Sequence, residues 1–542
     1  MAQRLSQFRS HQVRASAGGR RPMCRWGLSR RSAETELCRC LCSIAIDLLL
    51  VGSVHPRGWE PTMQTWSVVR YDMDLLAQDW PSELTGPIAD LGELMVRWRA
   101  VDGQRFLIRS DGVVDLRVNA FLSSARMRTL ASNTNRDYAQ SLCLWLNFLE
   151  ARGCVWSDAT EDDVDDFEFW RRTDPNNPVP VGASTFSKDV AACKKFYSWA
   201  AERFADVADI FLYVDPPPSK RSARVRWLDP AAVDRWRDVG LRGRDLRGRR
   251  DRSCRTRNEQ RDMAFFDGLY GTGLRLSEWA SVTIDEIPTL GAGRPFYKCH
   301  LADKCAKGGY GHPFWMPRNV LAGICAYVEG ARARAVRGAQ DSSRYAELSD
   351  AIVVGATKRP GSVRLPDGNG GFTDRAWNTT GPALRRRLFR RTQGGLEPIW
   401  LWLNENGLPR DPHGWHHTFA EANDRIAAKG LENFTCTPHM LRHSFALRWF
   451  SVGKLVYSSR LAHLSDEEAR DFRVQFGDTW HLVQTMLGHR RVETTRNVYL
   501  EPFRSLDVEV LLAQTQGLPV SGLLAELFDS HSMVLGDPVA RR

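Results

Sequence analysis

Six residues in the second half of the chain have the chemistry needed to act together on a phosphodiester. They are, in chain order, Arg275, Lys307, His439, Arg442, His489 and Tyr499. The transition state of phosphodiester transfer spreads negative charge over non-bridging oxygens, and the planar fork of arginine stabilises such charge with paired hydrogen bonds. Tyrosine can act as a nucleophile, whereas histidine and lysine can accept or donate protons. The set therefore fits the transfer of a DNA phosphodiester to a tyrosine without a metal ion or ATP.

Each of these residues lies in a short motif. The motifs are Gly-Thr-Gly-Leu-Arg-Leu-Ser-Glu around Arg275, Pro-His-Met-Leu-Arg-His with His439 and Arg442, and Leu-Gly-His ahead of Tyr499. Thr437-Pro438 is typical of a helix start. One helical turn separates His439 from Arg442, so both side chains can reach one phosphate. The neighbouring His443 is a candidate for a structural role.

In this order the motifs resemble those of the tyrosine recombinase (phage integrase) family, and they cover most of residues 261–501. The resemblance implies that Tyr499 is the nucleophile and that Arg275 and Arg442 stabilise the phosphate. A phenol is mostly protonated at neutral pH, so attack needs a cationic site or a nearby base. His439 is the residue expected to accept the proton, and His489 is expected to hydrogen-bond the phosphate.

Two further roles follow from the same resemblance. Glu278 would orient the basic cluster from behind. The family carries a lysine in a β-hairpin with a Lys-Gly step, and the turn between two short predicted strands in residues 296–317 contains both Lys304 and Lys307. Lys307 fits that step better and would protonate the leaving 5′ oxygen, with Lys304 as the alternative.

The resemblance also implies a product and partners. Attack would leave a 3′-phosphotyrosyl bond and a free 5′-hydroxyl, so that a second 5′-hydroxyl could reverse the step and exchange strands. No cofactor is expected. The expected partners are double-stranded DNA with specific attachment sites, three further copies in a tetramer on DNA, and accessory DNA-bending or directionality proteins. The chain is thereby predicted to be a cytoplasmic, nucleoid-associated recombinase that integrates or excises a mobile element.

Two alternatives stay open at this point. One is a type IB topoisomerase-like enzyme, which relaxes DNA without exchanging partners. The other is a catalytically inactive or architectural DNA-binding protein of the same fold. The spacing from Leu-Gly-His to Tyr499 disfavours the first alternative, and the complete set of expected residues disfavours the second.

Composition agrees with a nucleic-acid partner. The 542 residues carry a net charge of +11, and no long uninterrupted apolar span suggests a membrane helix. The twelve cysteines are scattered, which favours a reduced, intracellular protein. Cys24, Cys38, Cys40 and Cys42 form the one cluster, but their spacing lacks the two-residue knuckle of zinc sites, so we predict no metal.

Basic residues gather in two segments that are candidates for contact with DNA phosphates. The proline-rich linker at 215–226 contributes Lys220, Arg221, Arg224 and Arg226. The stretch beyond it contributes Arg247, Arg249, Arg250, Arg252, Arg255 and Arg257. Like charges at this density repel one another unless a polyanion is present.

The predicted fold class is mainly α with a small β-sheet in the catalytic domain (α+β), so that a helical core-binding domain precedes an integrase-like catalytic domain. The predicted parts are a basic leader (1–62), an N-terminal extension (63–114), the core-binding, SAM-like domain (115–214), the linker (215–226), the catalytic domain (227–515) and a tail (516–542). In the core-binding domain, helices are predicted from Ser132, Asp158 and Ser184, with aromatic stripes that belong to the core.

Within the catalytic domain, residues 399–403 are predicted to form a strand, and a helix is predicted around 415–428. Residues 361–395 are predicted to be an exposed insertion, and 461–476 a second insertion of unknown purpose. The Gly-Asn-Gly-Gly run in the first insertion lacks the Gly-Lys-Ser/Thr ending of a nucleotide-binding loop. Apolar repeats at 506–512 and 518–528 suit docking either on a neighbouring protomer or on the same chain.

Overall fold

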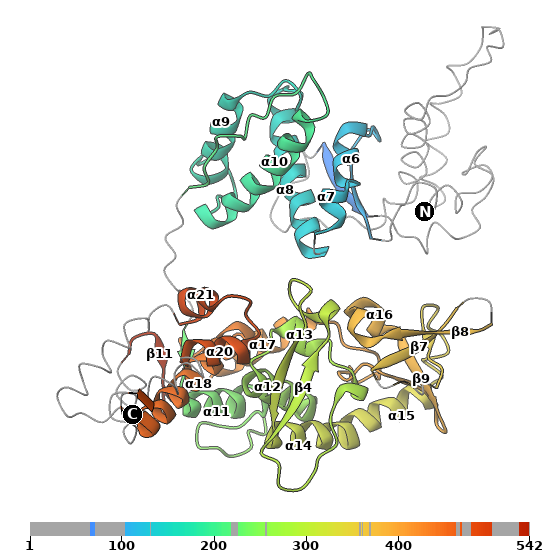
Figure 1. The fold of residues 1–542 in the computed structure, drawn as a ribbon, viewed down its shortest axis with the longest axis vertical. Coiled ribbons are helices and arrows are strands. Elements are labelled where there is room, and N and C mark those ends of the chain that lie inside the picture. Colours follow the sequence, from blue (N-terminus) through green and yellow to red (C-terminus); the bar gives the residue numbers. More distant parts are fainter. Residues whose placement is uncertain are drawn as a thin grey trace. The chain divides into compact units, whose positions relative to one another are not determined.

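The structure is a computed structural model that describes residues 65–70, 103–130, 132–217, 226–254, 257–356, 361–367, 370–461, 479–500 and 531–540, with 359, 465 and 467–468. Contacts divide the chain into two units, Met1–Arg221 and Ser222–Arg542 (Figure 1). The predicted leader, Lys220, Arg221, Arg224, Arg255 and most of the predicted insertion at 461–476 lie outside the described residues. None of the helices within the described part is long and apolar enough to cross a membrane.

The first unit is helical, with one small antiparallel ribbon. Its elements are β1 (Trp66–Arg70), β2 (Arg105–Arg109), α6 (Leu116–Leu122), α7 (Ala125–Arg128), α8 (Ser132–Ala151), α9 (Glu161–Arg172) and α10 (Ala183–Ala201). Two buried asparagines join the ribbon to the helices: Asn147 accepts from the amide of Trp66 at 2.8 Å, and Asn119 accepts from the amide of Leu107 at 2.7 Å. The described strands of the predicted N-terminal extension are therefore part of this unit.

The three helices predicted in this unit are confirmed as α8, α9 and α10. Thr160 begins α9 with a capping box, in which the carboxylate of Asp163 accepts from the Thr160 amide at 2.9 Å. The aromatic stripes pack into the core, as predicted. Trp145 is fully buried and donates from its indole N–H to the hydroxyl of Tyr197 at 3.1 Å.

The second unit combines helices with several small sheets. Its first half contains β3 (Trp227–Leu228), α11 (Pro230–Trp236), η2 (Arg237–Leu241), α12 (Glu259–Thr272), α13 (Leu276–Ala280), η3 (Ile284–Glu286), β4 (Phe296–Leu301), η4 (Asp303–Cys305), β5 (His312–Pro317), α14 (Arg318–Tyr327), η5 (Val328–Arg332) and α15 (Ala333–Asp341). The antiparallel pairing of β4 with β5 confirms the predicted hairpin.

The second half begins with the segment predicted as an insertion. Its elements are β6 (Ile352–Val353), β7 (Ser362–Pro366), β8 (Phe372–Ala376), η6 (Trp377–Thr379), α16 (Pro382–Arg386), β9 (Leu388–Thr392), β10 (Gly395–Pro398), α17 (Gly414–Ala427), α18 (Pro438–Leu461), α20 (Thr479–Leu487), α21 (Val492–Thr494), η7 (Thr495–Tyr499) and β11 (Val534–Leu535). Figure 1 shows α16 and β7 to β9 at one end of the unit, and α20 and α21 on the other side of α13. The mainly α fold class with small sheets is thereby confirmed.

The end of the chain packs on its own second unit. β11 pairs in parallel with β3, and Asp537 forms an ion pair with Arg235 at 3.1 Å. The apolar repeats at 506–512 and 518–528, to which the docking alternatives applied, lie outside the described residues.

The prediction that residues 361–395 form an exposed insertion is wrong for half of the segment. All five residues of β8 are exposed, but Leu388 and Phe389 of β9 are buried, and so is Arg385 of α16. Apolar side chains of β9 pack into the same cores as Ile399 and Leu403, which anchors the inner half of the insertion. Val363 of β7 is buried in the core of Leu388 and Ile399 as well, so among the strands described in this segment β8 is the exposed one.

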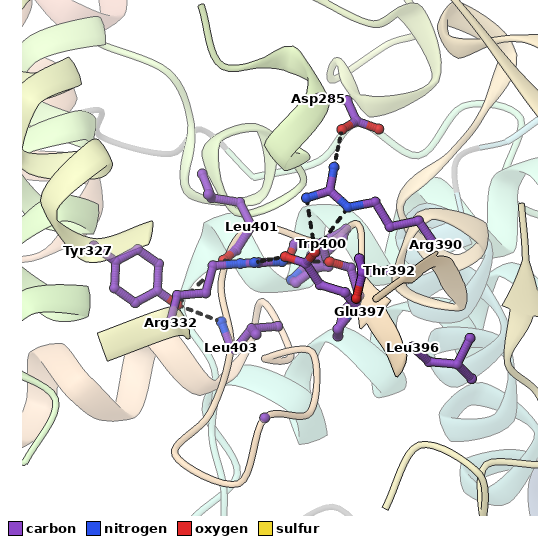
Figure 2. Close-up of polar contacts among 12 residues, drawn as sticks. Asp285, Tyr327, Arg332, Arg390, Thr392, Leu396, Glu397, Trp400, Leu401 and Leu403 are labelled. Atoms are coloured by element: carbon purple, nitrogen blue, oxygen red, sulfur yellow. Dashed lines mark hydrogen bonds and ion pairs between the residues drawn. The ribbon is translucent and has the colours of Figure 1, made fainter. Parts of the chain in front are cut away.

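The prediction of a strand at 399–403 is also wrong, because the segment forms only isolated bridges, at Trp400 and Leu403. Figure 2 shows the reason: the buried guanidinium of Arg332 donates to the carbonyls of this segment. Arg332 bonds to the carbonyl oxygens of Leu401 and Trp400, both at 3.2 Å. Backbone groups that a sheet ladder would have paired are satisfied by an arginine side chain instead.

Replacing Arg332 by methionine should destabilise the second unit by about 3 kcal/mol, because the change leaves buried backbone carbonyls without this donor and the Glu397 carboxylate with Arg390 as its remaining partner. Urea unfolding followed by tryptophan fluorescence measures this difference. Arg337→Met, on the exposed face of α15, is the matched control and should change stability by less than about 0.5 kcal/mol. Equal stability of the two variants would show that the network in Figure 2 contributes little.

Candidate active site

Gly273, whose backbone is in the left-handed conformation, turns the chain so that Arg275 lies near the helix that carries Arg442. Helix α12 ends at Gly273, whose φ is 68°, a conformation that favours glycine. A Cβ at Gly273 would lie 2.4 Å from the ring of Phe445, so this turn lies directly against α18. Arg275 is then the residue that precedes α13, and its side chain turns back toward Glu278.

The carboxylate of Glu278 is fully buried and binds three segments. It accepts from the guanidinium of Arg275 at 2.8 Å and from the backbone amide of Lys307 at 3.1 Å. The guanidinium of Arg442 lies 3.9 Å away. Burial alone would raise the pKa of Glu278, but Arg442 and Arg275 outweigh burial and hold that pKa below its usual value. Glu278 therefore stays ionised and lies against both arginines; that it orients the cluster stays a prediction.

Arg442 is buried and contacts the phenol of Tyr499. Its Nε donates to the Tyr499 hydroxyl at 3.1 Å, and Nη2 donates to the carbonyl of Leu487 at 2.8 Å. A further hydrogen bond joins Nη1 to the carbonyl of Gly273. Because these bonds come from three segments, the guanidinium is fixed before any substrate is present.

The ring of His489 is held in one tautomer. Arg442 can only donate, so its contact with Nε2 of His489 at 3.0 Å makes this nitrogen an acceptor. The proton is then on Nδ1, which donates to the hydroxyl of Thr495 at 2.8 Å. Burial, followed by Arg442 and Arg275, lowers the pKa of His489 to about 2. The imidazole is therefore neutral at physiological pH.

Tyr499 ends the π-helix η7, a rare element that recurs at functional sites. Its side chain is buried, with 4% of its surface exposed, among the rings of three histidines. The ring of His443 stacks on it at 4.4 Å between centroids, and those of His489 and His439 lie at 4.5 and 5.8 Å. The phenol is thus the centre of the cluster.

Two histidines one helical turn apart form a pair beside Tyr499. Nδ1 of the buried His443 lies 3.2 Å from the carbonyl oxygen of Tyr499, which can only accept, so this nitrogen carries the proton. Nε2 of His443 must then accept from Nε2 of His439, 3.0 Å away. Burial and His439 lower the pKa of His443 to about 3. When His439 is neutral, its Nδ1 is therefore the nitrogen with a lone pair.

His439 itself is also biased toward the neutral form. Although the residue as a whole is exposed, partial desolvation of its ring, and then the charges of Arg442, Arg275 and Lys307, lower the pKa of His439 below its usual value. A neutral imidazole with a free Nδ1 can accept a proton, which is the role predicted for His439.

The turn after β4 presents its two lysines differently. The side chain of Lys307 is exposed while its amide is bound by Glu278. Lys304 is also exposed, but the base of its side chain faces Gly381 in the insertion. The structure therefore joins Lys307, and not Lys304, to the carboxylate of the cluster through the backbone.

The basic loop between η2 and α12 is partly neutralised by acidic residues of the loop itself and of the segment before α17. Arg249 pairs with Asp245 at 3.2 Å, and Arg257 lies 3.9 Å from Glu405. Within the described residues, the remaining exposed arginines of the loop have no side-chain ion pair or hydrogen bond: Arg247, Arg250 and Arg252. Arg226, the one basic linker residue that is described, is exposed as well.

Two residues of the cluster were not assigned a role from the sequence, His312 and Thr495. His443 was predicted to be structural, without its contact with His439. The ring of His312 lies over Gly488, where a Cβ would come within 2.3 Å of its Nε2, and its pKa is lowered by burial. The four-residue spacing of His439 and His443 on a helix could have indicated their contact. No sequence signal relates His312 to Leu-Gly-His. In the part of the chain described here, no group of three or more histidine, cysteine or acidic side chains could hold a metal ion.

Comparison with known proteins gives consistent results. The family described as "Phage integrase, N-terminal SAM-like domain" matches residues 118–203. The chain is 30% identical over 381 residues to a tyrosine recombinase XerC of Roseiflexus castenholzii (strain DSM 13941 / HLO8), covering 70% of this chain and 87% of that relative. It is 24% identical over 413 residues to a tyrosine recombinase XerC of Roseiflexus sp. (strain RS-1), covering 76% of this chain and 96% of that relative.

Two solved structures are also similar. The XerH site-specific recombinase bound to palindromic difH substrate in a post-cleavage complex is 14% identical, with 71% of this chain and 81% of that chain covered and a TM-score of 0.41. The Tn1549 transposon integrase in complex with circular intermediate DNA is 15% identical, with 70% of this chain and 93% of that chain covered and a TM-score of 0.35.

The neutral, buried histidines predict how stability depends on pH. His443 and His489 have an ordinary pKa of 6.5 when unfolded and about 3 and about 2 when folded, so the unfolded chain binds more protons below pH 6.5. Their contribution to stability is complete above pH 6.5 and is lost as pH falls toward the folded values. As the pH falls from 6 to 5, protonation of each of these two histidines in the unfolded chain should lower the free energy of unfolding by about 1 kcal/mol. Urea unfolding at several pH values should show a slope smaller by that amount in His443→Asn. An unchanged slope would contradict the assignment of a neutral His443.

Proposed function

Because the chain belongs to the tyrosine recombinase family, we propose that it is a site-specific DNA recombinase that cleaves and rejoins strands through a 3′-phosphotyrosyl intermediate at Tyr499. The observation that carries the proposal is the hydrogen bond from the buried guanidinium of Arg442 to the Tyr499 hydroxyl, inside a cluster that Glu278 holds together. A phenol in this position meets the fixed cations that a phosphodiester would need.

In the proposed cleavage step, the Tyr499 oxygen forms a bond to phosphorus as the bond from phosphorus to the 5′ oxygen breaks. Arg275 and Arg442 stabilise the charge on the non-bridging oxygens. The phenol proton passes to Nδ1 of His439, which is the free nitrogen when the ring is neutral. Lys307 gives a proton to the leaving 5′ oxygen. Rejoining is the reverse of these transfers with a second 5′-hydroxyl, so no metal ion or ATP takes part.

His489 needs a change of tautomer to donate to a phosphate, because its Nε2 accepts from Arg442 in this arrangement. The change of tautomer keeps the hydrogen bond to Thr495, because its hydroxyl can either accept from Nδ1–H or donate to Nδ1. The change therefore costs little free energy. A phosphate that takes over the Arg442 N–H would leave Nε2 free to carry the proton.

The proposed substrate is double-stranded DNA with specific attachment sites, and the proposed working form is a tetramer on two duplexes. Integration or excision of a mobile element in the cytoplasm is the proposed role, with accessory DNA-bending or directionality proteins as further partners. The relatives named tyrosine recombinase and the DNA-bound recombinases among the similar structures support this class of substrate.

Trapping the covalent intermediate tests the proposal. Nicked suicide duplexes made from the DNA that flanks the gene should give an adduct on a denaturing gel with the wild-type protein. Tyr499→Phe should give none, since it lacks the nucleophile but keeps the ring stacked on His443. Strong DNA binding without an adduct on any flank would support the architectural alternative.

Two controls sharpen that result. Tyr213→Phe, which removes an exposed phenol elsewhere in the chain, should leave both the yield of the adduct and its position, mapped by proteolysis, unchanged. A supercoil-relaxation assay separates recombination from the topoisomerase-like alternative. Efficient relaxation of plasmids that lack the attachment site would contradict site-specific recombination.

The basic loop should contribute sequence-independent affinity. Replacing Arg247, Arg250 and Arg252 by glutamine should weaken DNA binding and reduce the slope of log affinity against log salt by about 0.9 per lost phosphate contact. Fluorescence anisotropy of a labelled duplex at several salt concentrations measures the slope. Arg334→Gln with Arg337→Gln, exposed on α15, is the control. An equal slope in the loop variant and the wild type would remove the loop from the DNA interface.

A further inference from the structure

The turn that carries Lys307 is attached to the insertion by a reciprocal side-chain pair. The amide of Asp303 donates to the side-chain oxygen of Asn378 at 2.9 Å, and the Asn378 side-chain nitrogen donates to Asp303 Oδ2 at 2.5 Å. The other carboxylate oxygen of Asp303 accepts from the amide of Gly311 at 2.7 Å, across the mouth of the turn. Asp303 therefore both closes the turn and connects it to η6.

A second set of contacts accompanies this pair. The thiol of the buried Cys305 donates to the carbonyl of Thr380 at 3.8 Å, and a Cβ on Gly381 would lie 3.8 Å from the Cβ of Lys304. The first half of the turn thus rests on the end of η6 and the start of α16.

The insertion is itself fixed to the segment that follows α13. The buried Arg385 donates to the carbonyls of Thr380 and Trp377, at 2.8 and 3.2 Å, which holds η6 in place. The same guanidinium donates to the carbonyl of Ser281 at 3.1 Å and to the carboxylate of Glu286 at 2.7 and 3.0 Å. A continuous series of hydrogen bonds therefore connects the segment after α13, through η6, to the turn that carries Lys307.

The opposite side of the turn faces the cluster. Glu278 accepts from the amide of Lys307, and His312 at the end of the turn lies over Gly488. The backbone of Lys307 is held between Glu278 on one side and the Asp303–Asn378 pair on the other, while its side chain stays exposed. Loss of either support would change where the ammonium group lies.

We infer that Asn378, a residue of the insertion, is a positioning residue for Lys307: it fixes the turn so that the lysine can protonate the leaving 5′ oxygen. The inference rests on the proposed function. Asn378 touches neither substrate nor reacting atoms, so its effect should be confined to the step that needs this proton. Phosphate binding by Arg275 and Arg442 should not depend on it, since their supports come from Glu278, Gly273 and Leu487.

A change of leaving group distinguishes this role from a general structural one. Suicide duplexes are prepared with either oxygen or sulfur at the bridging 5′ position of the scissile phosphate. A thiolate leaves without being protonated, because a thiol is far more acidic than an alcohol. Single-turnover cleavage of both duplexes is measured for the wild type, Asn378→Ala and Lys307→Ala. Thr373→Ala, an exposed position of β8 in the same insertion, is the matched control.

Asn378→Ala should cleave the oxygen duplex at least about 10-fold more slowly than the wild type, and the sulfur duplex within about twofold of it. Lys307→Ala should show the same pattern with a larger loss, and Thr373→Ala should cleave both like the wild type. Equal slowing of Asn378→Ala on both duplexes, or no slowing, would overturn the inference. Wild-type protein that forms no adduct on either duplex would instead overturn the proposed function.

A second variant tests the same contact by its pH dependence, so that the result does not rest on the alanine substitution alone. Asn378→Asp places a carboxylate against Asp303, and the two repel at high pH but share a proton at lower pH. Its cleavage rate on the oxygen duplex, relative to the wild type at the same pH, should rise from pH 8 to pH 6. A ratio that does not change with pH would contradict the contact between these side chains.

Discussion

The arrangement of the second unit depends on the buried carboxylate of Glu278. An ionised carboxylate in the interior costs several kcal/mol unless charges and hydrogen-bond donors compensate it. Its compensating groups come from the start of α13, from α18 and from the turn after β4. The charge is therefore stable only when all three segments have assembled. Folding thus brings together two arginines that would otherwise repel each other, before any phosphate arrives.

Desolvation and the same charge balance together keep the histidines around Tyr499 neutral. Arg275 and Arg442 carry two positive charges and Glu278 one negative charge, which leaves about one positive charge for one phosphodiester. Desolvation is the largest cause of the lowered pKa values of His439, His443 and His489, and the positive charge of the arginines lowers them further, because a third cation in this volume would be repelled. Neutral rings act as acceptors and donors in fixed tautomers. Under the proposed function, the arginines would bind the phosphate, whereas the neutral His439 would accept the proton of the phenol.

Much of this could be predicted from the sequence, because the strongest signals are local. The cap at Thr160, the break at Gly273 and the helix start at Thr437-Pro438 each depend on residues within a few positions. The order of motifs then identified Arg275, Arg442 and Tyr499, which the fold brings together. What could not be predicted depends on partners far apart in the chain. Residues 399–403 read as a strand because nothing nearby shows that a buried arginine on another helix satisfies their carbonyls.

The insertion follows the same logic. Its sequence is rich in glycine and arginine, which indicates exposure, yet one of those arginines, Arg385, is buried and donates to backbone carbonyls in the interior. Its contacts reach the lysine turn and the segment after α13, but none of those contacts involves the guanidinium of Arg442. Under the proposed function, a change in the insertion would therefore alter proton delivery by Lys307 while Arg275 and Arg442 keep the contacts that hold them. A segment inserted at this position would then affect one step of the proposed reaction and leave the two arginines in place.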